Sequence, residues 1–442
     1  MAIIQGIIGL IVLTGVAYLA SNNRKAINWK LVGMGFSLQI IFGILVMKVP
    51  AVASVFSTIS EGFVTVLSFS SSGARFLFGE LANSNKLGFI FAFNVLPTII
   101  FFSAVSAGLY YLGVLQKVVY GIAWVMSKTM KLSGAESLSV AGNIFMGQTE
   151  APLLIRPFVA KMSISELNCL MTGGMATLAG GVLAAYVTFL GGDDPEQQAL
   201  YASFLLSASI MNAPAAVVMS KMIQPEENID KINTKLEVNQ ESLGANLIDA
   251  VSIGAADGLK LALNVGGMLL AFIAVIALCN YGFDLIGRKL LDPIIYLFSD
   301  NWGSINDYIK ASTNGQFDKL SLEYVLGQVC RLAAFVMGVE WKDCLAVGSL
   351  LGQKTVINEF VAYQRLAEMK NANLLMPKSI LISTFALCGF SNFSSIAIQI
   401  GGIGGMAPSQ QANISRLGLK ALLGASLACM LSATVAGAIS EA

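Results

Sequence analysis

Histidine is absent from the 442 residues of this chain. Its absence excludes histidine general bases, the Ser-His-Asp triad, zinc sites with imidazole ligands and haem held by histidine. The six cysteines offer no alternative chemistry, because they are scattered singly through apolar segments without a Cys-x-x-Cys pair. We interpret them as small buried apolar residues. The chain therefore lacks most of the usual parts of an enzyme.

Charged residues are also scarce in this chain. They make up 12% of it, against roughly 25% in soluble domains, whereas hydrophobic residues make up 55% and the mean hydropathy is +0.72. The formal net charge of +1 gives no electrostatic case for a nucleic-acid partner. This composition predicts a membrane protein, and the 43 glycines favour close helix packing and interrupted helices.

The N-terminal region, residues 1–87, predicts scaffold helices and an interfacial helix. Residues 3–20 are apolar and a basic pair follows them, so we expect a first span whose N-terminus lies outside. A cleaved signal peptide is the alternative, although its positive charge would precede the apolar core. Residues 31–49 return to the outer side. Residues 50–86 are too polar to span comfortably and too apolar for a free loop, which favours a helix along the membrane or between subunits.

Residues 88–223 predict a first repeat, in which a broken apolar segment lies between membrane spans. A span over residues 88–114 precedes several lysines, which agrees with a cytoplasmic exit. The segment 133–160 is interrupted at Gly147 and Pro152. Where two short helices meet at a tip within a membrane, the backbone N–H and C=O groups of the tip find hydrogen-bond partners only inside protein or beside a water-filled cavity. We therefore expect this segment to form a re-entrant hairpin. The other spans of this repeat are expected over residues 165–190 and 199–222.

Residues 224–246 form the longest polar stretch and are expected to link two repeats. Residues 247–442 then follow the same order, with a second re-entrant hairpin at about 340–366. The remaining parts of this half are a semi-polar stretch at about 283–320, a broken apolar segment at about 322–366, and spans at about 259–280, 376–400 and 411–438. Two units of span, hairpin, span and span predict inverted repeats.

Two carboxylates, Glu150 and Glu359, lie deepest in apolar sequence, and each follows a Gly-Gln pair by a few residues. Polar groups at membrane depth are expensive and commonly serve a ligand. A carboxylate in such a cavity accepts strong hydrogen bonds from the hydroxyl or N–H groups of a polar solute. The alternative is that neighbouring backbone donors satisfy both groups within re-entrant loops. Matched polar tips in both halves favour a transporter.

Asn392 lies beside Ser394 and Ser395, inside the span expected over residues 376–400. Single serines in membrane helices commonly bond back to the helix, whereas an amide with two donors and an acceptor suits a ligand with several hydroxyls. Bonding of Asn392 to another helix is the alternative.

The paired glycines of Thr177-Leu178-Ala179-Gly180-Gly181 permit local unwinding of the span that contains them. Carbonyl and hydroxyl oxygens freed there would face others at Asn143 and Met146, and together they suit a small hard cation. The glycines equally suit close helix packing.

Four long motifs resemble the family of concentrative nucleoside transporters, and the resemblance covers essentially the whole chain. In order they are Gly147-Gln148-Thr149-Glu150-Ala151-Pro152-Leu153-Leu154-Ile155-Arg156-Pro157, Met171-Thr172-Gly173-Gly174-Met175-Ala176-Thr177-Leu178-Ala179-Gly180, Lys354-Thr355-Val356-Ile357-Asn358-Glu359-Phe360-Val361-Ala362-Tyr363 and Ala386-Leu387-Cys388-Gly389-Phe390-Ser391-Asn392-Phe393-Ser394-Ser395. The resemblance implies an all-α polytopic membrane protein with about eight transmembrane helices, two re-entrant helical hairpins and inverted repeats. It further implies a multi-pass homotrimer in the cell (inner) membrane, whose transport domain moves like an elevator against a fixed scaffold.

The resemblance also implies roles for particular residues. Gln148, Thr149 and Glu150 would face the nucleobase, Val182 would pack on it, and Phe390 would line the pocket. The residues expected to hold the ribose are Glu359, Asn392 and Ser395. Sodium, the implied coupling ion, would lie at Asn143, Met146, Thr177 and Leu178, with Thr149 nearby. The implied partners are the nucleoside, membrane lipid and further copies of the chain, without nucleic acid.

Several alternatives stay open from the sequence. Some members of the family use protons, for which Glu150 or Glu359 would be the carriers. Ser391 stands where many relatives have alanine. Its hydroxyl would either alter base preference or bond to the helix, and we favour the bond to the helix, which leaves base selectivity open. A passive channel would also use re-entrant hairpins, but only a coupled transporter accumulates its solute. An intramembrane enzyme would need paired aspartates within spans, whereas Asp193 and Asp194 lie in a turn.

Overall fold

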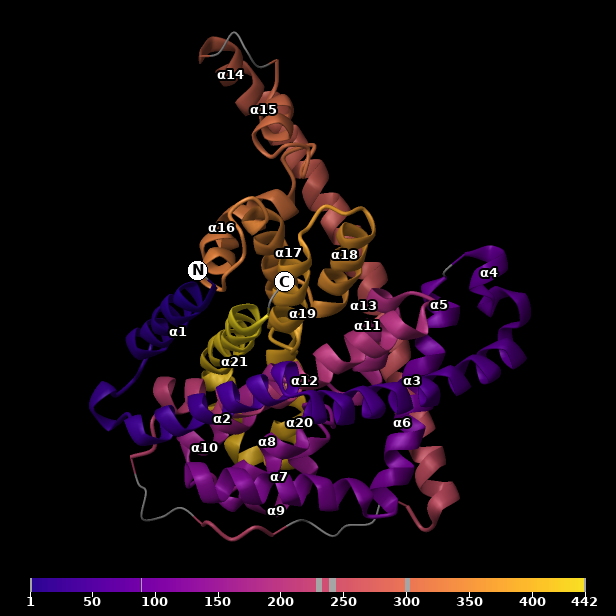
Figure 1. Cartoon of the computed structure of the whole chain (residues 1–442), viewed down its shortest axis with the longest axis vertical. Helices are drawn as coiled ribbons and strands as arrows, with labels where there is room; N and C mark the ends of the chain where they lie inside the picture. Colours follow the sequence, from indigo (N-terminus) through magenta and orange to yellow (C-terminus); the bar gives the residue numbers. More distant parts are fainter. Residues whose placement is uncertain (1, 89, 228–232, 238–243, 299–302, 441–442) are drawn as a thin grey trace.

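The computed structural model describes residues 2–88, 90–227, 233–237, 244–298 and 303–440. Helices and turns make up this part of the chain, and no β-strand occurs within it (Figure 1). The prediction of an all-α fold is therefore confirmed.

The helices occur in the following order along the chain. The N-terminal region contains α1 (Ala2–Leu19), η1 (Arg24–Ala26), α2 (Trp29–Lys48), α3 (Pro50–Phe78), η2 (Gly79–Ala82) and α4 (Ser84–Leu87). Next come α5 (Phe91–Asn94), α6 (Leu96–Tyr111), α7 (Val114–Met130), α8 (Gly134–Gly142), η3 (Ala151–Ile155), α9 (Arg156–Val159), α10 (Ile164–Ala176), α11 (Gly180–Gly191) and α12 (Pro195–Ile223). The last part contains α13 (Leu247–Ile286), η5 (Gly287–Leu291), α14 (Asp292–Phe298), α15 (Ile305–Ser312), α16 (Leu322–Val336), α17 (Cys344–Val356), α18 (Glu359–Asn371), α19 (Pro377–Leu387), α20 (Phe393–Met406), η6 (Pro408–Gln410) and α21 (Gln411–Ile439).

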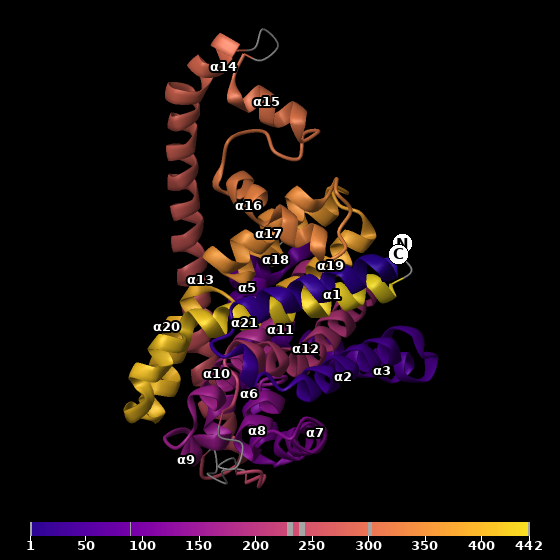
Figure 2. The ribbon, with the colours of Figure 1, turned by 90° about the vertical axis from the view of Figure 1, so that its left-hand side faces the viewer.

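Seven helical segments among the described residues are long and apolar enough to cross a membrane. They are Trp29–Lys48, Pro50–Ala82, Phe91–Tyr111, Ile164–Gly191, Pro195–Ile223, Leu247–Ile295 and Pro408–Ile439, and shorter apolar helices occur in α1, α19 and α20. The apolar window of α12 is 78% buried, whereas that of α13 is only 17% buried. α12 therefore belongs to the centre of the molecule, and α13 lies at its edge, where it extends beyond the main body (Figure 2).

Residues 50–86 are less polar than we predicted. They form α3 and short turns, and the length and composition of Pro50–Ala82 would allow it to cross a membrane. The hydroxyls of Thr58, Thr65 and Ser68 explain the difference, because each donates to a carbonyl of the same helix and so adds little polarity to its surface. Most of the surface of α3 is exposed in the single chain. That α3 lies along the membrane or between subunits stays a prediction.

Each segment predicted to form a hairpin contains a pair of short helical arms, and their re-entry into a membrane stays a prediction. In the first, α8 leads to a turn and returns through η3 and α9, and in the second α17 returns through α18. The first pair lies beside α7 at the lower end of the view, and the second lies higher, beside α16 and α19 (Figure 1). The order of long helix, helix, hairpin, broken pair and long helix occurs twice, from α6 to α12 and from α13 to α21.

Two broken helix pairs replace continuous spans. α10 and α11 are separated at residues 177–179, next to the paired glycines, whereas α19 and α20 are separated at residues 388–392, where we predicted an unbroken span. That prediction is wrong because Gly389 adopts a positive φ of 149° and Asn392 caps the start of α20.

The two breaks lie against each other at the centre of the molecule. A Cβ at Gly389 would lie 2.6 Å from the carbonyl oxygen of Ala176, so only glycine permits this approach. The Asn212 side chain of α12 donates to the Ala176 carbonyl at 2.7 Å and to the Cys388 carbonyl at 2.6 Å. One buried amide therefore satisfies a carbonyl from each broken pair.

Candidate functional site

A cavity of about 600 Å³ lies where the tips of the two hairpins approach the two helix breaks. All eight residues expected around a substrate line it: Gln148, Thr149, Glu150, Val182, Glu359, Phe390, Asn392 and Ser395. They come from both halves of the chain, because the first hairpin tip and α11 supply four of them, and α18, the second break and the start of α20 supply the rest. The structure therefore brings the predicted set together in one place.

Glu359 is held by side chains from two other elements. It is the first residue of α18, where a carboxylate is favoured by the helix dipole, and its side chain is 3% exposed. The hydroxyl of Tyr186 donates to one carboxylate oxygen at 3.1 Å, and the amide of Asn392 donates to the other at 2.7 Å. Each oxygen keeps a lone pair for a further donor. Sequence reasoning missed Tyr186, although it lies one helical turn after Val182 on α11.

Asn392 connects Glu359 to the start of α20. Its side-chain oxygen accepts from the backbone N–H of Ser395 at 2.9 Å and from the Ser394 hydroxyl at 2.6 Å, while its amide nitrogen donates to Glu359. The amide is thus an N-cap of a half-helix rather than a polar group within an unbroken span. Next to it, the Ser391 hydroxyl is buried and has no hydrogen-bond partner among the described residues, so the interpretation that it bonds to the helix is wrong.

Gln148 is held across the boundary between the two halves. Its amide nitrogen donates to the Ser395 hydroxyl at 3.1 Å, and its oxygen accepts from Gln399 at 3.2 Å. Gln399 also donates to the carbonyl of Met171 at 3.0 Å. Sequence reasoning missed Gln399, which lies one helical turn after Ser395 on α20.

Glu150 is exposed to the cavity, in contrast to Glu359. One of its carboxylate oxygens accepts from the backbone N–H of Gly147 at 3.1 Å, which closes the turn at the first hairpin tip. A smaller cavity of about 230 Å³ shares Glu150 with the larger one and extends to Met146. The tip therefore touches both cavities.

The long helix α13 forms the opposite wall of the larger cavity. Its polar residues Asp257, Lys260 and Asn264 line the cavity, and the Lys260 ammonium lies 3.5 Å from an Asp257 carboxylate oxygen. Sequence reasoning missed all three residues. It placed the start of this span at about residue 259, whereas α13 begins at Leu247 and its polar first turns continue directly into the apolar part.

The four residues expected around an ion lie between the first hairpin and the first helix break. Asn143 is fully buried, and neither polar atom of its side chain has a hydrogen-bond partner among the described residues. It lies beside Gly173, whose carbonyl accepts from the Thr177 hydroxyl at 2.9 Å. Hairpin and break are joined by the Gly180 N–H, which donates to the Phe145 carbonyl at 3.1 Å. The other two expected residues, Met146 and Leu178, are also buried in this region.

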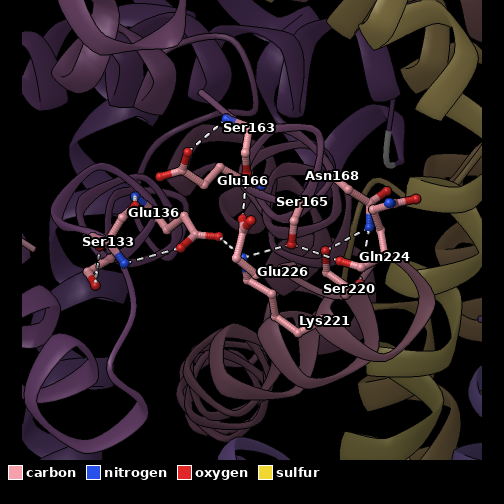
Figure 3. A network of polar contacts seen from close by, with 11 residues as sticks. Ser133, Glu136, Ser163, Ser165, Glu166, Asn168, Ser220, Lys221, Gln224 and Glu226 are labelled. Atoms are coloured by element: carbon pink, nitrogen blue, oxygen red, sulfur yellow. Dashed lines mark hydrogen bonds and ion pairs between the residues drawn. The ribbon is translucent and has the colours of Figure 1, made fainter. Parts of the chain in front are cut away.

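A buried polar network fixes the base of the first hairpin (Figure 3). Glu136 of α8 forms an ion pair with Lys221 of α12, and Lys221 also donates to the Ser165 hydroxyl of α10 at 3.0 Å. Ser133 and Ser163 begin α8 and α10 with capping boxes. The hairpin is therefore tied to α10 and α12 by charge as well as by packing.

Three family models match the chain. The model described as Na+ dependent nucleoside transporter C-terminus matches residues 204–437, and the corresponding N-terminus model matches residues 8–81. A model described as nucleoside recognition matches residues 92–193.

Curated relatives agree with these models. An uncharacterized transporter of Haemophilus influenzae is 38% identical over 99% of this chain and 98% of its own length. Sodium/nucleoside cotransporter 1 of Mus musculus is 37% identical over 97% of this chain, which spans only 62% of the mouse protein.

Solved structures have the same fold. CNTnw in an inward-facing substrate-bound state is 37% identical, with a TM-score of 0.85 over 99% of both chains. A CNTnw variant in an outward-facing state is 36% identical, with a TM-score of 0.86 over the same shares. With matches over its whole length, the chain belongs to the Na+ dependent nucleoside transporter family, whose members are multi-pass membrane transporters rather than enzymes.

Proposed function

We propose that this chain imports nucleosides through a cell (inner) membrane by symport with sodium. The observation that carries the proposal is the convergence of eight residues on one cavity between the hairpin tips. A ribose presents adjacent hydroxyl donors, and the Glu359 carboxylate offers charged acceptors for them. A nucleobase edge presents donors and acceptors that suit the Gln148 amide, while Val182 and Phe390 supply apolar surface for its faces.

The proposed coupling ion lies at Asn143, Met146, Thr177 and Leu178. α8 and α10 both end in this region without a basic residue in the last turn, so partial negative charge from two helix ends is left uncompensated. The buried Asn143 amide supplies an oxygen that no described residue uses. Oxygen donors from side chains and unwound backbone are what a hard cation prefers. The names of the mammalian relatives support sodium as that cation.

Coupling follows from the shared hairpin tip. Asn143 and Met146 precede the turn that carries Gln148 and Glu150, so a cation bound at the former pair orders the latter. Each ligand should therefore raise the affinity of the other.

For the transport step we propose an elevator-like motion. The hairpins and broken helices would move as one body against a scaffold that includes α13, and the cavity lies between these two parts. In the proposed homotrimer, the exposed apolar faces of α3 and α13 would contact lipid or neighbouring subunits.

Proton symport is the second candidate, and its carriers would be Glu150 or Glu359. Uptake of radiolabelled uridine into proteoliposomes distinguishes the candidates, with an inward sodium gradient, with choline in place of sodium, or with a pH gradient alone. We expect accumulation that requires sodium. Accumulation driven by the pH gradient in choline would favour protons, and equilibration without accumulation would favour a passive channel.

A further inference from the structure

Lys354 carries a buried positive charge that the proposed transport site does not use. It lies in the last turn of α17 and is only 3% exposed. Its ammonium donates to the carbonyl of Ala386 at 2.8 Å, and Ala386 lies next to the end of α19, just before the second helix break. A charge at this depth needs compensation from its surroundings.

The compensation comes from two helix ends. Lys354 belongs to the last turn of α17, and α19, which has no basic residue in its own last turn, ends at Leu387. The C-terminal end of a helix carries partial negative charge, which a cation stabilises. The Lys354 charge also attracts the Glu359 carboxylate, which begins the other arm of the same hairpin. The Lys354 ammonium thus compensates the partial negative charge at the end of one hairpin arm, α17, and at the end of α19 beside the break.

The first half of the chain has the same arrangement without the lysine. There α8, the first arm of the hairpin, and α10, the first half of the broken pair, end close together with no basic residue in either last turn. The buried Asn143 amide stands at the end of α8 with its polar atoms unpartnered among the described residues. This is the region that we propose for sodium.

We propose that the Lys354 ammonium is a tethered cation, which occupies in the second half of the chain the place that a dissociable cation takes in the first half. The inference rests on the proposed function for its counterpart in the first half. It means that the ribose side of the cavity, at Glu359 and Asn392, is charge-compensated in every step of the cycle. Only the nucleobase side of the cavity depends on a cation that dissociates during the cycle. One cation should then be transported per nucleoside, because the Lys354 ammonium never leaves the second site.

Removing the side chain should open a second cation site. We expect purified Lys354→Ala to bind one more radioactive sodium ion per chain at equilibrium than the wild type does. In proteoliposomes the Hill coefficient for sodium in uridine uptake should rise from about 1 to about 2, because two cations now bind cooperatively. Lys354→Met fills the space without a charge, so it should gain no sodium site and lose about tenfold or more of its uptake at every sodium concentration.

The control is Lys117→Ala, which makes the same lysine-to-alanine change at an exposed position of α7. It should leave the number of sodium ions bound per chain unchanged. Folding is checked by size-exclusion chromatography in sodium and in choline, and we expect Lys354→Ala to be monodisperse at least in sodium.

An equal number of bound sodium ions in Lys354→Ala and wild type would overturn the proposal. Aggregation of Lys354→Ala even in high sodium would overturn it too, because sodium would then fail to replace the ammonium. Wild-type uptake by Lys354→Met would show that the charge has no role. The test reads a difference of one site between variant and wild type, so it can be read whether or not the wild type binds sodium. A wild type that binds no sodium would sink sodium symport and the cation of the first half, whereas a site gained in Lys354→Ala would still show that Lys354 fills a cation site in the second half.

Discussion

At the scale of single residues, the site consists of groups that the motifs mark and of groups that hold them. Gln148, Glu359 and Asn392 stand out in the sequence because amides and carboxylates are rare in apolar segments. Tyr186 and Gln399, which hold two of them, do not stand out. A tyrosine or glutamine in a helix gives no sign of the direction of its polar end, which depends on packing between elements far apart in the chain. The residues that we propose for binding were therefore predictable, whereas the residues that hold them in place were not.

Glu359→Gln should weaken nucleoside binding. The amide that replaces one carboxylate oxygen is a donor and would face either Tyr186 or Asn392, both of which donate to the carboxylate in the native protein. Hydrogen bonds to a charged group contribute about 1.5–3 kcal/mol, so we expect an affinity for uridine lower by about 10- to 100-fold. Isothermal titration calorimetry in sodium measures it, with the exposed Glu61→Gln as control. Wild-type affinity in Glu359→Gln would contradict the proposed ribose contact.

Asn143→Ala should weaken sodium binding rather than nucleoside binding. Loss of one oxygen ligand should lower the apparent sodium affinity by about tenfold, which corresponds to about 1.4 kcal/mol. Uridine affinity should recover at saturating sodium, because no nucleoside contact has been removed. Asn168→Ala removes a buried amide of α10 that bonds to Ser220 and controls for general loss of stability. An unchanged sodium dependence in Asn143→Ala would exclude this amide from the ion site.

At the scale of elements, the interruptions decide the architecture. The first hairpin and the first break were predictable because Gly147, Pro152 and the pair Gly180-Gly181 mark them in sequence. The second break carries one glycine and no proline, so hydropathy alone predicted an unbroken span. A tertiary contact interrupts the helix here, because Gly389 lies against the Ala176 carbonyl of the other break. A contact between segments more than two hundred residues apart leaves no local pattern.

Gly389→Ala should destabilise the junction of the two breaks. The added Cβ would lie 2.6 Å from the Ala176 carbonyl oxygen, and a φ of 149° is unfavourable for alanine. Backbone strain of this kind costs about 1–3 kcal/mol, and the steric clash adds to it. Gly401→Ala is the control, since nothing lies within 4 Å of its added Cβ. Melting followed by size-exclusion chromatography should show a lower midpoint for Gly389→Ala only, and equal midpoints would mean that the junction relaxes without cost.

At the scale of the whole molecule, the cavity lies between the hairpin tips and α13, so its walls come from three distant parts of the chain. The repeated order of spans and hairpins was predictable from hydropathy, because each unit carries its own polar interruption. The wall on α13 was not predictable. In the sequence, Asp257 and Lys260 look like the ordinary polar start of a helix, and only the packed structure places them opposite the hairpin tips. Ligand selectivity therefore belongs to the assembled molecule as well as to its motifs.

The thermodynamic coupling between sodium binding and nucleoside binding tests the arrangement of the whole molecule. The regions that we propose for the ion and for the nucleobase share one hairpin tip, so the two binding free energies should be coupled through the order of that tip. Thermodynamic reciprocity requires the factor by which sodium raises uridine affinity to equal the factor by which uridine raises sodium affinity, and such couplings amount to about 1–3 kcal/mol. Uridine titrations in sodium and in choline at constant ionic strength give the first factor, and sodium titrations with and without uridine give the second. Two equal factors well above one would support coupling through the tip, whereas a uridine dissociation constant that is the same in sodium and in choline would mean that the two regions do not communicate.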